Sequence, residues 1–250
     1  MSVKREFIAL LFLCASCTSD NESNMVENPA APGFDYENSD PAGIELADSV
    51  MAAMGGRRNW DDTRFISWKF SSRNLVWDKQ TGRVRIETGD STIYLININT
   101  GEGRVQIKGE EILQEDQLKT KLKEAKNYWI NDSYWLVMPF KLKDTGVTLK
   151  YLGEETVGDS SRYNLLEITF NDVGNTPQNK YLLYIDIRDN LVKQWAYYRE
   201  ADQDSASFVL PWDNYKNYGN ILLSADRTGG RGPRSVSVDR QISDSVFVNF

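Results

Sequence analysis

Few side chains in this 250-residue sequence are suited to covalent chemistry. The sequence has no histidine, which excludes Ser-His-Asp triads and every metal site that needs an imidazole ligand. Two carboxylates ~5 to ~10 Å apart could hydrolyse a glycoside, but no pair stands out among the 36 acidic residues. The residue types favour a binding protein over an enzyme, and we predict no catalytic residue, cofactor or metal site. An enzyme that uses only carboxylates, Tyr or Lys stays open as the alternative.

The two cysteines, Cys14 and Cys17, lie at the end of an N-terminal targeting segment. Two basic residues precede an apolar run over residues 7–13, which is too short to cross a ~30 Å hydrocarbon core but fits a secretory signal peptide over residues 1–16. The end of this segment, "LCAS" before Cys17, resembles the lipobox of bacterial lipoproteins, with Cys14 where that pattern usually has Leu. The resemblance implies that Cys17 is lipidated and becomes the mature N-terminus. An ordinary cleaved signal that releases a free periplasmic protein is the alternative.

Residues 17–39 are polar and acidic and contain prolines, and we interpret them as a flexible linker between the lipid and the folded domain. The several acyl chains of a bacterial lipoprotein hold a protein at a membrane without a spanning helix. With Cys17 lipidated, no cysteine is left for a thiolate nucleophile or a disulfide. The "SDNE" segment after Cys17 resembles signals that send Bacteroidota lipoproteins to the cell surface. We therefore expect an outer-membrane lipoprotein that faces the periplasm or the cell surface.

Charge limits the partners of this protein. The net charge is −7, and removal of residues 1–16 leaves the chain acidic. An acidic chain suits neither nucleic acid nor an anionic membrane face. The expected partners are therefore the membrane, through the N-terminal lipid, and a lipid or lipidated ligand.

Aromatic residues are numerous, with seven Trp and twelve Tyr. Such residues dominate protein cores, but they also wall cavities for apolar ligands and provide flat platforms for sugar rings. For each residue alone, core packing is the simpler interpretation. Together they support a hydrophobic groove or, as the alternative, a carbohydrate-binding surface. The candidate groove residues are Trp68, Trp77, Tyr94, Trp129, Trp135, Phe140 and Trp195.

The periodicity of the apolar residues predicts the elements that must position these side chains. Residues 40–56 form an amphipathic helix, with Asp40 as its cap, Pro41 in its first turn and a Gly-Gly stop. Over residues 64–107, short alternating runs separated by turns predict an antiparallel meander. A second amphipathic helix lies within residues 115–130. Further alternating runs predict strands up to a final one, "DSVFVNF".

The segment "YWINDSYWLVMPFKLKDTG", residues 128–146, contains a small polar island within an apolar stretch. We predict that the second helix ends here, with residues 131–133 as its polar stop, and that an extended segment with Pro139 at an edge or bend follows. A satisfied polar cluster at the mouth of a groove is the alternative for residues 131–133. The unbroken apolar part, residues 134–140, is too short to span a membrane.

The element order predicts an α+β fold that is mainly β. We expect a large curved antiparallel sheet, an unclosed barrel of about 11–12 strands, with two helices covering one face. Residues 40–250 would form this single half-barrel domain.

Five segments in this order resemble an uncharacterised family of Bacteroidota lipoproteins: "VMAAMGG", "LVWDKQTGRVRIE", "YLININTGEG", "WINDSYWLVMPFKLKDTGVTLKY" and "TPQNKYLLYID". The resemblance runs from about residue 40 to residue 226. The layout also resembles the lipoprotein-localisation carriers, in which an unclosed β-barrel covered by helices holds acyl chains in an apolar cavity. These resemblances imply a non-enzymatic, lipid-anchored envelope protein that binds a hydrophobic or lipidated ligand in a groove. A surface carbohydrate- or protein-binding module without a carrier cavity is the alternative.

Overall fold

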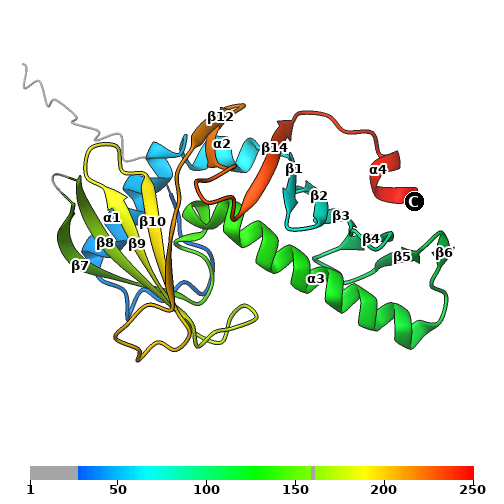
Figure 1. The fold of residues 1–250 in the computed structure, drawn as a ribbon, viewed down its shortest axis with the longest axis horizontal. Coiled ribbons are helices and arrows are strands. Elements are labelled where there is room, and N and C mark those ends of the chain that lie inside the picture. The colour runs from blue at the N-terminus through cyan, green and yellow to red at the C-terminus, as the bar shows by residue number, and fades with distance from the viewer. Residues whose placement is uncertain (1–27, 159–160) are drawn as a thin grey trace, which may run out of the picture.

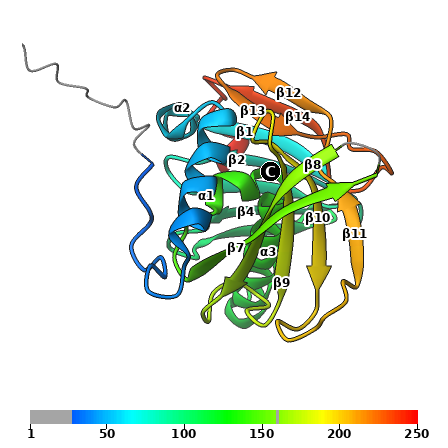
Figure 2. The same ribbon diagram turned by 90° about the vertical axis from the view of Figure 1, so that its left-hand side faces the viewer.

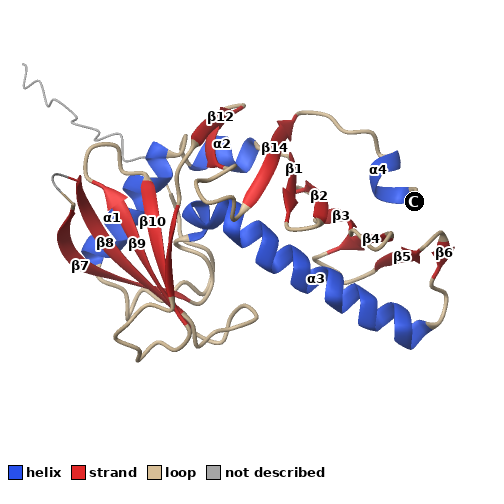
Figure 3. Ribbon diagram, viewed as in Figure 1, coloured by secondary structure: helices blue, strands red, loops and turns tan. Residues whose placement is uncertain are grey.

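The computed structural model describes residues 28–158 and 161–250. These ranges contain fourteen strands, the two longer helices α1 (Pro41–Ala53) and α3 (Glu115–Val137), and the short helices α2 (Arg57–Asp62), η1 (Met138–Lys141) and α4 (Ser245–Val248). The strands pair antiparallel and no sheet in these ranges closes on itself (Figure 3). The predicted mainly-β, antiparallel and unclosed fold class is therefore confirmed. The predicted signal peptide and the lipid attachment at Cys17 lie outside the described residues.

The first sheet has seven strands in the order β14-β1-β2-β3-β4-β5-β6. Strands β1 to β6 follow one another along the chain, as the meander prediction requires, because the turns between them are too short for crossovers. Strand β14 comes from the C-terminal part of the chain and pairs with β1. The bounds are β1 (Phe65–Phe70), β2 (Arg73–Asp78), β3 (Arg83–Glu87), β4 (Thr92–Asn97), β5 (Gly103–Ile107), β6 (Glu110–Glu111) and β14 (Pro233–Asp239).

The second sheet has five strands in the order β11-β10-β9-β8-β7, and a separate hairpin consists of β12 and β13. The strands are thus divided between sheets, where the sequence predicts one sheet of about 11–12 strands. The division arises because α3, with 23 residues, carries the chain ~35 Å from the edge of the first sheet before β7 begins (Figure 1). The bounds are β7 (Val147–Val157), β8 (Ser161–Phe170), β9 (Lys180–Asp186), β10 (Val192–Tyr198), β11 (Phe208–Pro211), β12 (Tyr215–Tyr218) and β13 (Ile221–Ser224).

The final predicted strand, "DSVFVNF", is instead the short helix α4 followed by an extended C-terminus. Arg85 of β3 donates hydrogen bonds to the carbonyl oxygens of Val246, at 3.2 Å, and Asn249, at 2.6 Å. The rings of Phe65 and Phe247 lie 6.1 Å apart. Arginine side chains, rather than a neighbouring strand, therefore satisfy these carbonyls, and long-range contacts override the local alternation.

Residues 28–39, which fall within the predicted flexible linker over residues 17–39, lie against the second sheet. The backbone N–H of Asp35 donates to the carbonyl oxygen of Val147 at 3.2 Å, and the ring of Phe34 is buried in the core. This segment covers the start of β7, which is an edge strand that would otherwise expose unpaired backbone groups. The folded body therefore includes residues 28–39 as well as the predicted domain.

Helix α1 lies beside β7 (Figure 2). Pro41 occupies its first turn, and Gly55 and Gly56 follow its end with positive φ angles of 111° and 87°, as the stop signal predicts. Asp40 occupies the predicted N-cap position, but its side chain makes no capping hydrogen bond. Its carboxylate instead accepts from the backbone N–H of Tyr151 at 3.1 Å, so it ties the helix to the sheet.

Helix α3 covers one face of the first sheet (Figure 1). Leu122 on its inward face is buried, as the amphipathic pattern predicts. Further along, Trp129 lies edge-on to Trp77 of β2, with ring centroids 5.3 Å apart. Gly103 of β5 leaves no room for a side chain, since an added Cβ would lie 2.9 Å from Cδ2 of Leu122 and 2.1 Å from the carbonyl oxygen of Leu95.

The polar island at residues 131–133 does not stop α3, which continues past it and passes into η1. Asp132 is fully buried and forms a bidentate ion pair with Arg73 at the start of β2, with Nε–Oδ2 at 2.6 Å and Nη2–Oδ1 at 2.8 Å. Asn131 donates a further hydrogen bond to Oδ1 at 2.9 Å. The prediction of a polar stop is wrong because the partner that satisfies the carboxylate is distant in the sequence.

The segment after the polar island is helical rather than extended. It completes α3 and then forms the 3-10 helix η1, in which Pro139 occupies the first turn. A proline is tolerated there because the first turn of a helix leaves its N–H groups without intrahelical partners. Pro139 is therefore a helix-start residue and not an edge-strand residue.

The close approach at Gly103 makes a first testable prediction. Gly103→Ala should lower the free energy of unfolding by ~2 kcal/mol or more, because the methyl group collides with the backbone of β4 and with Leu122. Urea unfolding followed by tryptophan fluorescence measures this change. Gly89→Ala is the matched control, since its Cβ would meet Ser72 at an ordinary 3.5 Å. Equal stability of the two variants would contradict the proposed packing of α3 on β5.

The buried ion pair makes a second prediction. Asp132→Asn leaves Arg73, whose side chain is 18% exposed, without its charged partner, and should cost ~3 kcal/mol of stability in urea unfolding. Asp62→Asn is the control, because its pair with Arg58 is solvent-exposed at 74% and 95% and should contribute under ~1 kcal/mol. If Asp132→Asn were as stable as this control, the ion pair would not hold α3 in place.

Candidate functional site

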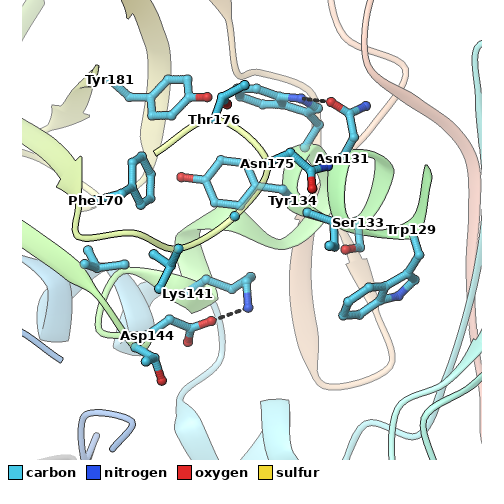
Figure 4. Close-up of a pocket in the computed structure, with 16 residues that line it drawn as sticks. Trp129, Asn131, Ser133, Tyr134, Lys141, Asp144, Phe170, Asn175, Thr176 and Tyr181 are labelled. Carbon is cyan, nitrogen blue, oxygen red and sulfur yellow. Dashed lines mark hydrogen bonds and ion pairs between the residues drawn. The ribbon is translucent and has the colours of Figure 1, made fainter. Parts of the chain in front are cut away.

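The C-terminal half of α3 forms one wall of a cavity of about 300 Å³ (Figure 4). The other walls come from the turn after η1, the start of β7, and the loop that joins β8 to β9. This aromatic cavity is lined by five rings, which belong to Trp129, Tyr134, Trp135, Phe170 and Tyr181.

The rings of the aromatic cavity contact one another. The centroid of Tyr134 lies 6.3 Å from that of Phe170 and 5.9 Å from that of Tyr181. Tyr181 also lies 5.7 Å from Phe170 and 5.5 Å from Trp135, edge-on in both cases. Strand pairing explains part of this cluster, because Ile168 of β8 lies opposite Tyr181 of β9 and so brings the end of one strand beside the start of the next.

The two tyrosines bring hydroxyl groups but no charge to the aromatic cavity. Burial raises the pKa of Tyr134 and that of Tyr181 well above the usual value for a phenol. Both phenols are therefore neutral at physiological pH and can donate or accept a hydrogen bond. They are unsuited to act as anionic nucleophiles.

Polar side chains surround the aromatic wall. Asn131 lies on α3, and its Oδ1 accepts a hydrogen bond from Nε1 of Trp135 at 3.3 Å. Asn175 lies on the β8–β9 loop. The charged residues that line the cavity, Lys141 and Asp144, form an ion pair with each other (Figure 4). The cavity is thus apolar in its walls, hydrogen-bonding at its edge and neutral in net charge.

A second cavity of about 220 Å³ shares Trp135 with the aromatic cavity. The indole of Trp135 stacks on that of Trp195 from β10, with centroids 4.1 Å apart and ring planes at 30°. Phe208 of β11 lies edge-on to Trp195 at 5.3 Å. Two arginines, Arg227 and Arg231, also line this second cavity. Trp135 therefore contributes to both cavities.

The structure separates the seven predicted groove residues into two groups. Trp129 and Trp135 line the aromatic cavity, and Trp135 and Trp195 line the second cavity. The remaining four are buried in the core, where neighbouring rings or α3 cover them: Trp68, Trp77, Tyr94 and Phe140. Ligand binding by any of the seven stays a prediction.

The burial of the four core residues has specific causes. Tyr94 lies on the sheet face that α3 covers, 6.1 Å from the ring of Tyr128. Phe140 stacks on Trp60 of α2, at 4.4 Å between centroids and 11° between planes. The first contact fills space between α3 and the first sheet, and the second packs η1 against α2.

Sequence reasoning missed Tyr134, Phe170 and Tyr181, which form the centre of the aromatic wall. A usable signal was present for two of them, because Phe170 and Tyr181 flank the segment Gly-Asn-Thr-Pro at residues 174–177, whose residue types are typical of a turn. Aromatic residues on either side of a hairpin turn lie on neighbouring strand ends and face a common space. Tyr134 had no such signal, because the predicted end of α3 hid its helical position.

The side chains of the site combine aromatic rings with neutral hydrogen-bonding groups. Within residues 28–158 and 161–250, no group of three acidic or cysteine side chains is placed to hold a metal ion. In the same ranges, no helix is long and apolar enough to cross a membrane. The arrangement can bury an apolar chain or ring and hydrogen-bond to its polar end.

Comparison with known proteins gives distant similarities. No family model and no curated protein matches the sequence. Among solved structures, the chain is similar to a DUF1329 family protein from Desulfovibrio piger, at 14% identity and a TM-score of 0.44, over 82% of this chain and 95% of that one. It is also similar to MucB, solved in complex with MucA, at 12% identity and a TM-score of 0.25, over 82% of this chain and 58% of that one. Neither similarity bears on what this chain binds.

Proposed function

We propose that this protein is a non-enzymatic lipoprotein of the bacterial cell envelope, anchored through Cys17, and that it binds a hydrophobic ligand in the aromatic cavity. The supporting observation is the wall of five aromatic rings. Its two phenols are neutral, and the charged residues at its edge, Lys141 and Asp144, form an ion pair with each other. Burial of apolar surface contributes ~25 cal/mol per Å², and no unpaired charge in this cavity opposes it. The same wall would reject a strongly charged group.

The size of the aromatic cavity limits the ligand. Pockets for small molecules span ~300 to ~1,000 Å³, so a cavity of about 300 Å³ stands at the lower end of that range. It suits one acyl chain or one ring system. A lipidated partner would insert a single chain and leave its remaining chains outside.

A carbohydrate ligand is the second candidate, and the composition of the cavity edge favours it. Asn131, Asn175 and Thr176 supply amide and hydroxyl groups beside the indoles of Trp129 and Trp135. Sugar rings bind through this combination of a flat aromatic face and several neutral hydrogen-bonding groups. The two ligand classes differ in whether binding needs an alkyl chain.

A blocking substitution tests the hydrophobic-ligand proposal. Thr176 is exposed and lines the aromatic cavity, so Thr176→Arg places a long charged side chain at the lining without removing core contacts. Binding of 1-decanol, measured by isothermal titration calorimetry, should weaken at least tenfold because the apolar volume is occupied and charged. Gln178→Arg is the matched control, since Gln178 is exposed on the same loop but does not line the cavity.

Three outcomes decide this test. Loss in Thr176→Arg with unchanged binding in Gln178→Arg supports the proposal. Equal effects of the two substitutions would contradict it, as would a wild-type protein that takes up no decanol. Binding of a soluble oligosaccharide that is sensitive to Thr176→Arg, without any decanol binding, would replace it by the carbohydrate alternative.

Membrane anchoring is tested separately. In cells that express the full chain, Cys17→Ala should move the protein from the membrane pellet to the soluble fraction, because no acyl chains can be attached. Cys14→Ala is the control and should leave the protein in the membrane. Retention of the Cys17→Ala variant, or release of the Cys14→Ala variant, would show that the lipid attachment has been assigned to the wrong residue.

A further inference from the structure

Arg227, in the segment between β13 and β14, is a buried cation without a paired anion. Arg227 is only 5% exposed. No carboxylate oxygen of the described chain lies within 4.0 Å of its guanidinium nitrogens. Every other strongly buried charge named above has a partner of opposite sign, as Asp132 has Arg73. A buried charge that lacks such a partner costs free energy unless something else neutralises it.

Neutral groups hold part of the Arg227 guanidinium. Nε donates to Oγ of Ser224 at 2.7 Å, and Nη2 donates to the carbonyl oxygens of Trp135 at 2.7 Å and of Ser224 at 3.1 Å. The guanidinium carbon lies 3.5 Å from the ring centroid of Trp212. These contacts fix the position of the group and satisfy its Nε and Nη2 donors, but they supply no negative charge.

The third guanidinium nitrogen, Nη1, has no hydrogen-bond partner in the described chain and is not among its fully enclosed polar atoms. Its neighbour is Gly232, where an added Cβ would lie 3.3 Å from Nη1, so the glycine keeps space beside this nitrogen. Burial lowers the pKa of Arg227 to about 9, which leaves the group protonated at neutral pH. Two N–H groups of a charged guanidinium thus remain free beside a cavity.

Arg227 lines the second cavity, whose charged lining residues are all positive. Arg231 lies at the same cavity and is exposed, and no acidic residue is among the lining residues. The aromatic cavity, in contrast, has its lysine paired with an aspartate. In a chain of net charge −7, two arginines at one apolar cavity whose lining contains no acidic residue form a local anion-binding environment, and the charge of Asp213, which also acts on Arg227, lies outside that lining.

We propose that the second cavity binds the carboxylate of a small amphipathic acid. The carboxylate accepts hydrogen bonds from Nη1 of Arg227 and from the guanidinium of Arg231, and the hydrophobic body of the acid lies against Trp195, Phe208 and Leu210. A planar guanidinium matches a carboxylate, and a charge-assisted hydrogen bond is stronger than one between neutral groups. The small volume of about 220 Å³ favours a compact monoanion over a phospholipid head group with its chains.

This site goes beyond the proposed binding of a hydrophobic ligand, because it recognises charge where the aromatic cavity does not. The two cavities share Trp135 but differ in their remaining lining residues. A structural role for Arg227 alone, in fixing its loop to the carbonyl of Trp135, predicts no selectivity for acids.

Matched acid and alcohol probes test the proposal. Isothermal titration calorimetry of the full folded domain should show 4-phenylbutyrate binding at least tenfold more tightly than 4-phenylbutan-1-ol, with a preference that declines as salt is added. Arg231→Glu reverses an exposed charge at the cavity and should reduce acid binding at least fivefold while alcohol binding is unchanged. Arg240→Glu makes the same change of charge at an exposed residue that does not line the cavity and should have little effect. Arg227→Gln should abolish the preference, with folding checked by near-ultraviolet circular dichroism.

The outcomes separate this site from the aromatic cavity. Equal affinities of the wild-type protein for the acid and the alcohol would overturn the proposal, as would equal losses in the Arg231→Glu and Arg240→Glu variants. If Arg227→Gln fails to fold, the comparison of those two surface variants still decides the matter. Thr176→Arg should leave the acid preference intact, so failure of one site would not imply failure of the other.

Discussion

The ion pair between Asp132 and Arg73 fixes the position of α3, and the candidate sites depend on that position. A carboxylate on the buried face of a helix is tolerated only when a partner compensates its loss of hydration. Arg73 provides two nearly parallel hydrogen bonds from the start of β2, which restrict both the rotation and the translation of the helix against the first sheet. Residues four or seven apart share a helix face, so Leu136 and Ala125 are buried on the same side as Asp132. Tyr134 and Trp135 lie in the same last turns of α3 and line the cavities.

The helix links two sheets that do not share a strand ladder. Its first turns lie on the first sheet, and its last turns lie beside the second sheet and the segment after β13 (Figure 1). Trp135 joins these parts, because its indole stacks on Trp195 while its carbonyl oxygen accepts from Arg227. Cavities form at this junction because the edges of three packed units meet there, and curved sheets and a straight helix cannot fill every space between them.

The sequence predicted those features that depend on local periodicity. Alternation gave the meander of β1 to β5, and the spacing of Leu118, Leu122 and Ala125 gave the inward face of α3. Features that depend on distant partners were not predictable. The polar island looked like a helix stop because Arg73 is 59 residues away from Asp132. The C-terminal helix α4 alternates like a strand, but arginines on β3 and β5 bind its carbonyls.

The candidate site was likewise predictable only in part, because residue types are local but their exposure depends on distant partners. The sequence named Trp129, Trp135 and Trp195 by residue type, but it could not separate them from tryptophans that α3 covers, because exposure depends on where α3 ends. The sequence could not distinguish Arg227 from Arg231 and Arg234, because nothing in the glycine-rich segment 227–234 shows which arginine side chain turns inward. A buried and unpaired charge becomes visible only when the surrounding chain is in place.

Charge also accounts for the different selectivities that we propose for the two adjacent cavities. The net charge of −7 repels an anion at long range, but salt screens this repulsion beyond ~10 Å. The charged residues that line the second cavity are Arg227 and Arg231, and low surrounding polarity strengthens their attraction for an anion. In the aromatic cavity, Asp144 neutralises Lys141, so apolar contact dominates there. The difference in selectivity therefore rests on one local fact: the lysine of the aromatic cavity has an acidic partner among the lining residues, whereas the arginines of the second cavity do not.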